Sequence, residues 1–126
     1  MSGPEREDLR IRTKRFALRI IQLYPFLPHS TEAQVIGKQV LRSGTSVCAQ
    51  YREGFRAKSN ADFVNKLQGA LQELEETGYW LELLIEAELV PAKRLQDLLQ
   101  EAETLKAILV TIIRKVKQYP RDKGKE

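Results

Sequence analysis

The stretch LQDLLQEAETLKAILVTIIRKV, residues 95–116, indicates the fold most directly. Its apolar positions alternate in steps of three and four, a pattern typical of the seam of a helix bundle or coiled coil. We expect a helix whose buried seam comprises Leu95, Leu98, Ala102, Leu105, Leu109, Ile112 and Val116. A long amphipathic helix needs apolar partners, so the preceding residues must supply them.

Proline and glycine divide the preceding residues into three further helical stretches, none of which alternates like a half-buried strand. The first stretch ends near Pro25, and the second runs from a Ser30 cap to about Ala57. The third follows a Ser59 cap. Short turns between long helices make neighbours antiparallel, which predicts an all-α, up-down antiparallel four-helix bundle. We expect the bundle over 10–119, a flexible N-terminal segment over 1–9 and a charged C-terminal tail over 120–126.

Two glycines, Gly37 and Gly44, lie on the apolar side of the second helix, seven residues apart. Each glycine costs about 1 kcal/mol of helix propensity relative to alanine. We expect close packing of a neighbouring helix to offset that cost.

Composition excludes several classes of protein. The chain has 126 residues, which fits one domain, and its one cysteine, Cys48, excludes an intramolecular disulfide or a cysteine-based zinc site. Apolar runs are too short to span a membrane, and the charged opening MSGPEREDLRIR does not resemble a signal peptide. We expect a cytoplasmic protein without membrane partners, and Cys48 as a small buried filler.

Charge is distributed unevenly along the chain, although the formal net charge is only +4. Residues 1–29 hold six basic and three acidic groups, and 30–58 hold five and two. Residues 59–90 hold one basic and seven acidic groups, whereas 91–126 hold nine and five. The third helix is therefore acidic, and the other three are basic.

The basic residues recur at spacings of three and four, which gathers them on helix faces that could contact phosphates. The candidate nucleic-acid-binding residues are Arg12, Arg15, Arg19, Lys38, Arg42, Arg52, Arg56, Arg114, Lys115 and Lys117. A second interpretation stays open, because the second and third helices should form an antiparallel hairpin about Lys58. Arg42 would then lie level with 73–76, and Arg52 and Arg56 near Asp62, as internal ion pairs.

The chemistry of enzymes and metal sites has little support. The one histidine, His29, lies in a loop between prolines, so the Glu-x-x-His pairs of a di-iron bundle cannot form. A nucleophilic cysteine needs an adjacent base, and Cys48 has none nearby in sequence. A phosphate-binding loop is not expected at 43–46, because this segment has a single glycine and lies inside a helical pattern. We expect no catalytic residues, no metal ligands, no cofactors and no enzyme activity.

Several phrases in the sequence resemble a known family. They are RTKRFA at 12–17, VIGKQVLRSGTSV at 35–47, YRE at 51–53 and ETGYWL at 76–81. The chain resembles, over roughly 10–117, the bacterial four-helix-bundle family encoded within intervening sequences of 23S rRNA genes. The resemblance implies a ring-like homo-oligomer, usually a pentamer. It also implies kinship with the accessory variability protein of diversity-generating retroelements, a basic barrel that binds nucleic acid and a reverse transcriptase.

Two functions follow as expectations. The first is a non-catalytic oligomer that binds RNA or an RNA/DNA hybrid through its basic helix faces. The alternative is a scaffold for a protein partner, for example a reverse transcriptase, with the basic stripes paired to the acidic third helix.

Overall fold

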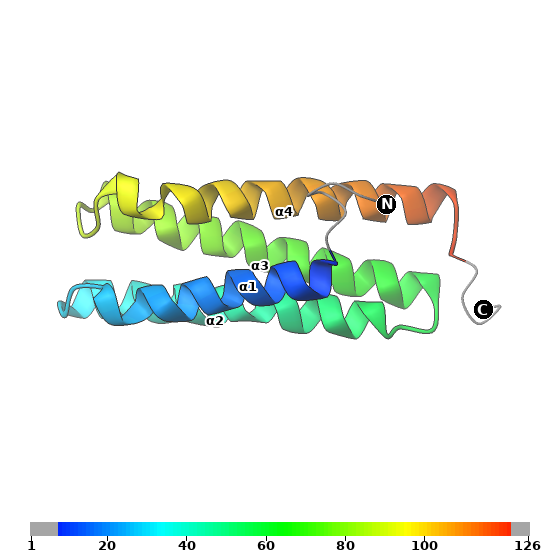
Figure 1. The fold of residues 1–126 in the computed structure, drawn as a ribbon, viewed down its shortest axis with the longest axis horizontal. Coiled ribbons are helices and arrows are strands. Elements are labelled where there is room, and N and C mark those ends of the chain that lie inside the picture. The colour runs from blue at the N-terminus through cyan, green and yellow to red at the C-terminus, as the bar shows by residue number, and fades with distance from the viewer. Residues whose placement is uncertain (1–7, 122–126) are drawn as a thin grey trace.

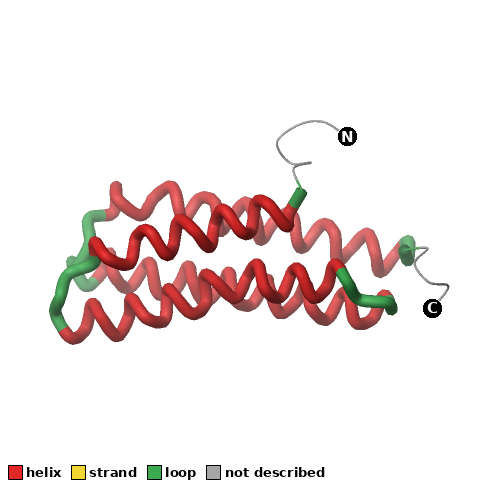
Figure 2. Tube along the Cα trace, turned by 60° about the horizontal axis from the view of Figure 1, so that its bottom comes forward, coloured by secondary structure: helices red, strands yellow, loops and turns green. Residues whose placement is uncertain are grey.

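The computed structural model describes residues 8–121, which form four antiparallel helices joined by short connections (Figure 1). The helices are α1 (Leu9–Leu23), α2 (Thr31–Phe55), α3 (Asn60–Glu86) and α4 (Ala92–Gln118), with a 3-10 turn, η2 (Tyr24–Phe26), after α1. Figure 2 shows the connections at the two ends of the bundle. The predicted all-α four-helix bundle is confirmed, and residues 8–121 contain no strand.

Polar caps fix where the first three helices begin. Ser30 Oγ accepts a bond from the N–H of Ala33 at 3.3 Å, and Ser59 Oγ does the same for Asp62 at 3.0 Å, as predicted. Asp8 Oδ1 caps α1, so this helix already begins at Leu9, inside the segment expected to precede the bundle. Residues 1–7 of that segment lie outside the described residues.

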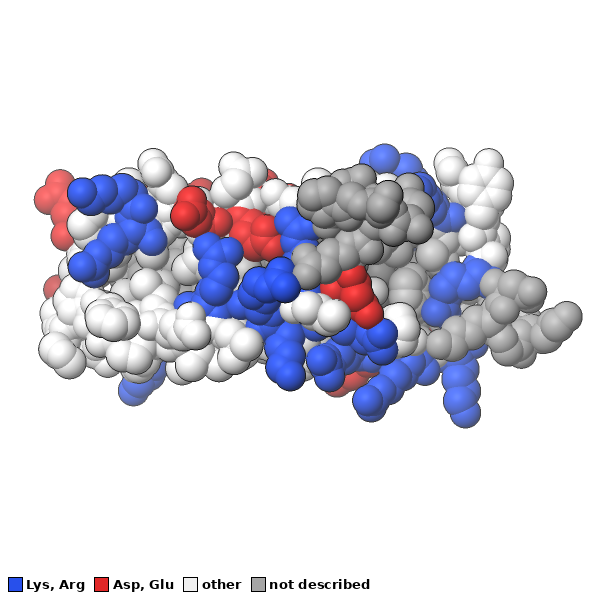
Figure 3. Space-filling view, in the orientation of Figure 1, with Lys and Arg blue, Asp and Glu red and all other residues white. Residues whose placement is uncertain are grey.

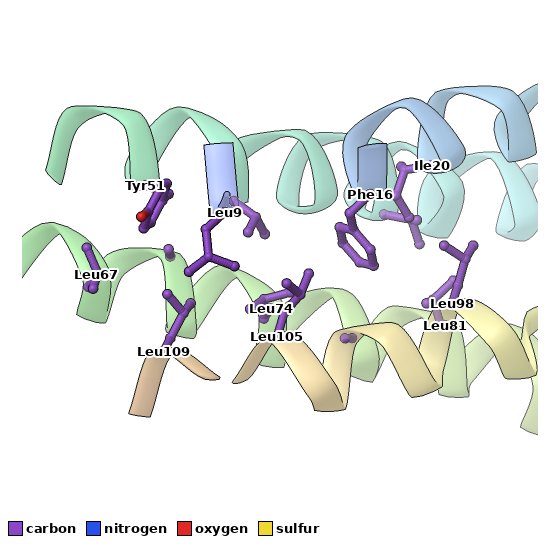
Figure 4. Packing of buried hydrophobic residues seen from close by; sticks show 14 of the residues in the cluster. Leu9, Phe16, Ile20, Tyr51, Leu67, Leu74, Leu81, Leu98, Leu105 and Leu109 are labelled. Atoms are coloured by element: carbon purple, nitrogen blue, oxygen red, sulfur yellow. The ribbon is translucent and has the colours of Figure 1, made fainter. Parts of the chain in front are cut away.

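The core is one cluster of apolar side chains from all four helices. Figure 4 shows part of it from close by. On α3 one stripe of residues is buried, namely Phe63, Leu67, Ala70, Leu74, Thr77, Leu81 and Leu84. Removing one such leucine from water stabilises the fold by about 1.5–3 kcal/mol. Inside the core, Thr77 Oγ1 donates to Ser43 Oγ at 2.8 Å, and this bond links α3 to α2.

The seam of α4 differs from the prediction at one position. Ile113 is buried, with 8% of its surface exposed, whereas Ile112 packs only partly against the core. The strict heptad placed Ile112 in the seam, but an α-helix has 3.6 residues per turn and drifts relative to a 3.5-residue repeat. Near its C-terminal end α4 therefore presents Ile113 to the core and leaves Ile112 on its flank.

Two glycines on α2 allow α1 and the segment that follows it to pack closely against this helix. A Cβ atom added at Gly44 would lie 2.8 Å from Cγ1 of Ile20, and one added at Gly37 would lie 2.5 Å from Cδ1 of Leu27. Both distances are shorter than ordinary van der Waals contacts. The expected close approach of a neighbouring helix is confirmed at Gly44, where the neighbour is α1. At Gly37 the close neighbours are Tyr24 of η2 and Leu27, which follows η2.

The bundle is uneven because its helices differ in length. α1 has 15 residues, whereas α2 has 25 and α3 and α4 have 27 each. α1 starts well short of the end at which α2 turns into α3 (Figure 1). It packs extensively on α2 and makes few contacts with α4, so the α1–α4 side of the bundle is thinly closed.

The chain after α4 returns toward the connection between α2 and α3. Arg121 Nε donates to Asn60 Oδ1 at 2.8 Å, and Nη2 donates to the carbonyl oxygen of Ser59 at 2.9 Å. Its guanidinium also lies 4.0 Å from the ring centroid of Phe63. The first part of the expected charged tail is thus anchored, while 122–126 lie outside the described residues.

Candidate nucleic-acid interface

Two of the predicted phosphate-binding arginines hold the fold together instead. Arg12 on α1 forms a two-bond ion pair with Glu101 on α4, with Nε to Oε2 at 2.8 Å and Nη2 to Oε1 at 3.0 Å. Their side chains are 14% and 18% exposed. Such a pair is geometrically specific, and it leaves Arg12 committed to the link between α1 and α4.

Arg42 is engaged by the acidic helix, as the antiparallel register predicted. Its Nη2 atom lies 2.5 Å from Oε1 of Glu76, and its Nη1 atom lies 3.5 Å from Oε1 of Glu73. The hydrogen bond from Arg42 lowers the pKa of Glu76, whereas burial raises the pKa of Glu73. The charge of Arg42 is therefore compensated within the bundle.

Arg52 and Arg56 are exposed, and the predicted ion pairs with Asp62 are wrong, since neither arginine makes an ion pair within 8–121. In this part of α2 the ion pair with α3 is made by Glu53, whose Oε1 atom lies 3.0 Å from Nζ of Lys66. Arg52 and Arg56 instead line a hollow of about 270 Å³ at the start of α1.

We call this hollow the arginine hollow; its lining residues are Asp8, Arg10, Ile11, Arg52, Phe55 and Arg56. Arg10 Nη2 donates to Asp8 Oδ2 at 2.7 Å, and this hydrogen bond lowers the pKa of Asp8. The guanidinium of Arg10 lies 4.1 Å from the ring centroid of Phe55. Three arginines thus surround one carboxylate, which leaves a positive surface at the junction of α1 and α2.

Sequence reasoning missed Arg10 and Phe55 as parts of this surface. The signal lies in the register of α1 on α2: because Ile20 faces Gly44, an antiparallel pair of helices brings Arg10 beside Phe55. Counting charges helix by helix does not reveal that neighbourhood, since it depends on how two helices are aligned.

The other predicted basic residues are spread over α1, α2 and α4. Arg15, Lys38, Arg114, Lys115 and Lys117 are exposed, and Arg19 is half-buried. Figure 3 shows Lys and Arg side chains gathered along the middle and lower right of one face, over α1 and the C-terminal half of α2. The structure therefore brings Arg52 and Arg56 together with Arg10, while Arg12 and Arg42 are drawn into ion pairs.

Other reactive side chains lie apart from this surface. Cys48 is buried as expected, and its Sγ atom lies 3.9 Å from the carbonyl oxygen of Arg10. His29 is exposed in the connection between α1 and α2. Across 8–121 no three His, Cys, Asp or Glu side chains converge as a metal site would require. In that same range no helix is both long enough and apolar enough to cross a membrane.

Comparisons with known proteins agree with this architecture. The family model described as "23S rRNA-intervening sequence protein" matches residues 7–111. A crystal structure of a protein of unknown function from the S23 ribosomal protein family of Bacteroides thetaiotaomicron is 41% identical in sequence, with a TM-score of 0.79. The match covers 85% of this chain and 99% of the other. The comparison with curated proteins gave no match. The phrase VIGKQVLRSGTSV at 35–47 and the bundle thus have one explanation: the chain belongs to the 23S rRNA-intervening sequence protein family.

Proposed function

We propose that this protein is a non-catalytic oligomer that binds RNA or an RNA/DNA hybrid through basic faces of α1, α2 and α4. The arginine hollow carries the proposal, because Arg52 and Arg56 are exposed one helical turn apart and form no ion pair within 8–121. Unpaired cations at that spacing suit neighbouring phosphates of a nucleic-acid strand.

Further cations lie elsewhere on α1, α2 and α4. Those that are exposed or half-buried and form no ion pair within the described residues are Arg19, Lys38, Arg114, Lys115 and Lys117. Ionic contacts of Lys and Arg side chains with backbone phosphates do not distinguish base sequences. Binding should therefore be weakly sequence-specific and steeply dependent on salt. Arg12 and Arg42 contribute little, because their charges are compensated.

The test is fluorescence anisotropy of a labelled single-stranded RNA, titrated with protein over a series of salt concentrations. Removing both charges with Arg52→Gln and Arg56→Gln should lower the magnitude of the slope of log K against log salt by about 1.4, at about 0.7 per phosphate contact. The matched control removes two exposed cations from the start of α4, with Lys93→Gln and Arg94→Gln. A slope that the two double variants reduce equally would contradict the role of the hollow, and no binding by the wild type at low salt would refute the function.

Self-association is part of the proposal, with the pentamer taken from the family resemblance. An apolar row on α1 supports it: Ile11, Leu18 and Ile21 are 53%, 47% and 47% exposed, at spacings that place them on one face. Light scattering coupled to size exclusion tests the assembly. Leu18→Glu should reduce the particle mass if this row is buried between subunits, and an unchanged mass would remove the row from the interface.

The second candidate function is a scaffold for a protein partner, such as a reverse transcriptase. The observation that favours it is the commitment of Arg12 and Arg42 to Glu101, Glu73 and Glu76, which reduces the free positive charge. Affinity capture after nuclease treatment separates the candidates, since one protein retained in fixed proportion supports the scaffold, and nucleic acid recovered alone opposes it.

A further inference from the structure

A groove lies between α2 and α4, beyond the start of α1. We propose that it binds an amphipathic α-helix of a partner protein that carries acidic side chains beside its apolar stripe. The inference rests on the scaffold candidate and specifies the kind of partner; it does not depend on nucleic-acid binding.

The groove exists because α1 is shorter than the helices around it. α1 begins at Leu9, while α4 continues to Gln118 and α2 to Phe55, so the walls extend past the first helix (Figure 1). The space has a volume of about 710 Å³ and is open to solvent. Along α4 its lining runs from Ala107 to Lys115, which is about 12 Å at 1.5 Å per residue.

The floor of the groove is apolar and has helical spacing. Tyr51 and Phe55 are four residues apart on α2, and Ile108 and Ile112 are four apart on α4. Phe55 is 41% exposed, and both isoleucines pack only partly against the core. Side chains four apart form ridges against which another helix can pack. In a fully closed four-helix bundle, a helix would occupy this position beyond the start of α1. An amphipathic helix is therefore the occupant that matches this surface.

The rim of the groove is positively charged, which determines the chemistry beside the apolar stripe. Lys115 stands on the α4 side and forms no ion pair within 8–121. Arg10 stands on the α1 side with Asp8, and Arg52 and Arg56 line the adjoining arginine hollow. The described rim thus holds more cations than carboxylates, so acidic residues on the incoming helix would be attracted and basic ones repelled.

A nucleobase suits the groove less well than a helix. Binding of single strands generally relies on an open aromatic face on which bases stack. One face of the Phe55 ring is covered by the guanidinium of Arg10 at 4.1 Å, and the ring of Tyr51 lies 6.3 Å away, tilted by 39°. A base stacked on that face would have to displace Arg10 from both Phe55 and Asp8.

The experiment uses a fluorescein-labelled helical peptide of about 14 residues, enough to span the groove. The peptide carries Leu at positions i, i+3, i+4 and i+7 with Glu beside that row, and a second peptide carries Lys in place of every Glu. Anisotropy titrations of the full chain should give at least about tenfold tighter binding of the Glu peptide than of the Lys peptide. Equal affinity, or equal binding of a scrambled Glu peptide, would overturn the proposal.

Variants then place the peptide in the groove. Ile112→Glu should weaken the Glu peptide by about tenfold or more, whereas the matched control Val110→Glu, on another side of α4, should leave its affinity within about twofold. Lys115→Glu changes an exposed side chain and should shift the preference toward the Lys peptide, which keeps the test decisive even if Ile112→Glu unfolds.

Two outcomes would assign the groove to another occupant and overturn the inference. One such outcome is a single-stranded RNA that displaces the Glu peptide and whose affinity falls with Ile112→Glu as much as the affinity of the peptide does. This result would indicate nucleic acid in the groove. A fall in particle mass caused by Ile112→Glu, but not by Val110→Glu, would indicate a second copy of the chain. Loss of RNA binding with Arg52→Gln and Arg56→Gln, and retention of peptide binding, would leave this inference standing.

Discussion

Two glycines in the middle of helices should respond in opposite ways to the same substitution. A Cβ added at Gly78 on α3 meets no heavy atom within 4 Å, whereas one added at Gly44 on α2 would lie 2.8, 3.1 and 3.2 Å from three side-chain atoms of Ile20. Gly to Ala in a helix contributes about 1 kcal/mol of propensity at either position. Gly78→Ala should therefore raise the free energy of unfolding by about 1 kcal/mol.

At Gly44 the propensity gain competes with overpacking. Ile20 is buried, with 1% of its surface exposed, so it cannot swing into solvent to make room. Forcing an extra carbon into a packed core costs about 1–3 kcal/mol. The cost exceeds the gain over most of that range, so Gly44→Ala should lower the free energy of unfolding by about 1 kcal/mol. Adding Ile20→Val, which removes a methyl group from the contact, should recover part of the loss.

The assay is urea denaturation followed by circular dichroism, with all variants at one protein concentration because self-association would add to apparent stability. The sign of the difference is the decisive quantity. If Gly44→Ala stabilised the protein as much as Gly78→Ala, α1 would not approach α2 as closely as the structure indicates, and the reasoning would fail.

Three other substitutions test local features in the same assay. Glu88 has a φ of 61°, which favours glycine, so Glu88→Gly should stabilise by up to about 1 kcal/mol, and a loss would contradict backbone strain there. Glu101→Gln should cost about 2 kcal/mol by leaving Arg12 half-satisfied between α1 and α4, and a cost below about 0.5 kcal/mol would show that this pair is not structural. Glu76→Gln should cost less than about 1 kcal/mol at pH 7, because the pair with Arg42 is partly exposed. Since this pair lowers the pKa of Glu76, the difference should vanish as pH falls from 4.5 through the lowered value, and a difference that persisted in acid would not be electrostatic.

Patterns within one helix were predictable from the sequence, because burial there depends on local spacing. The α4 seam from Leu95 to Leu109 is buried as expected. The pairing of Arg42 with Glu73 and Glu76 was also predictable, because a hairpin of two consecutive helices fixes their register. The limit of this reasoning is seen where Ile113 is buried in place of the predicted Ile112. A small angular drift per turn accumulates along a helix of 27 residues.

Features between helices distant in sequence could not be read from spacing. Arg12 and Glu101 are 89 residues apart, and their meeting depends on how the first and last helices close the bundle. The arginine hollow depends on where α1 begins relative to α2, and helix ends are the least certain part of a sequence-based prediction. The groove follows from unequal helix lengths, which heptad patterns do not reveal.

The short first helix also affects how the protein opens. α2 and α3 share the largest contact in the bundle, whereas α1 has extensive contacts on one side and few on the other. Less buried surface must be exposed to detach α1 than to separate α2 from α3, so local opening of α1 should require less free energy than global unfolding. Hydrogen exchange would then show amides of α1 exchanging before those of α2 and α3, as a separate cooperative unit. Since α1 begins beside the groove and, with its cap Asp8, bears half of the arginine hollow, this unit is the one that a bound partner would protect most strongly.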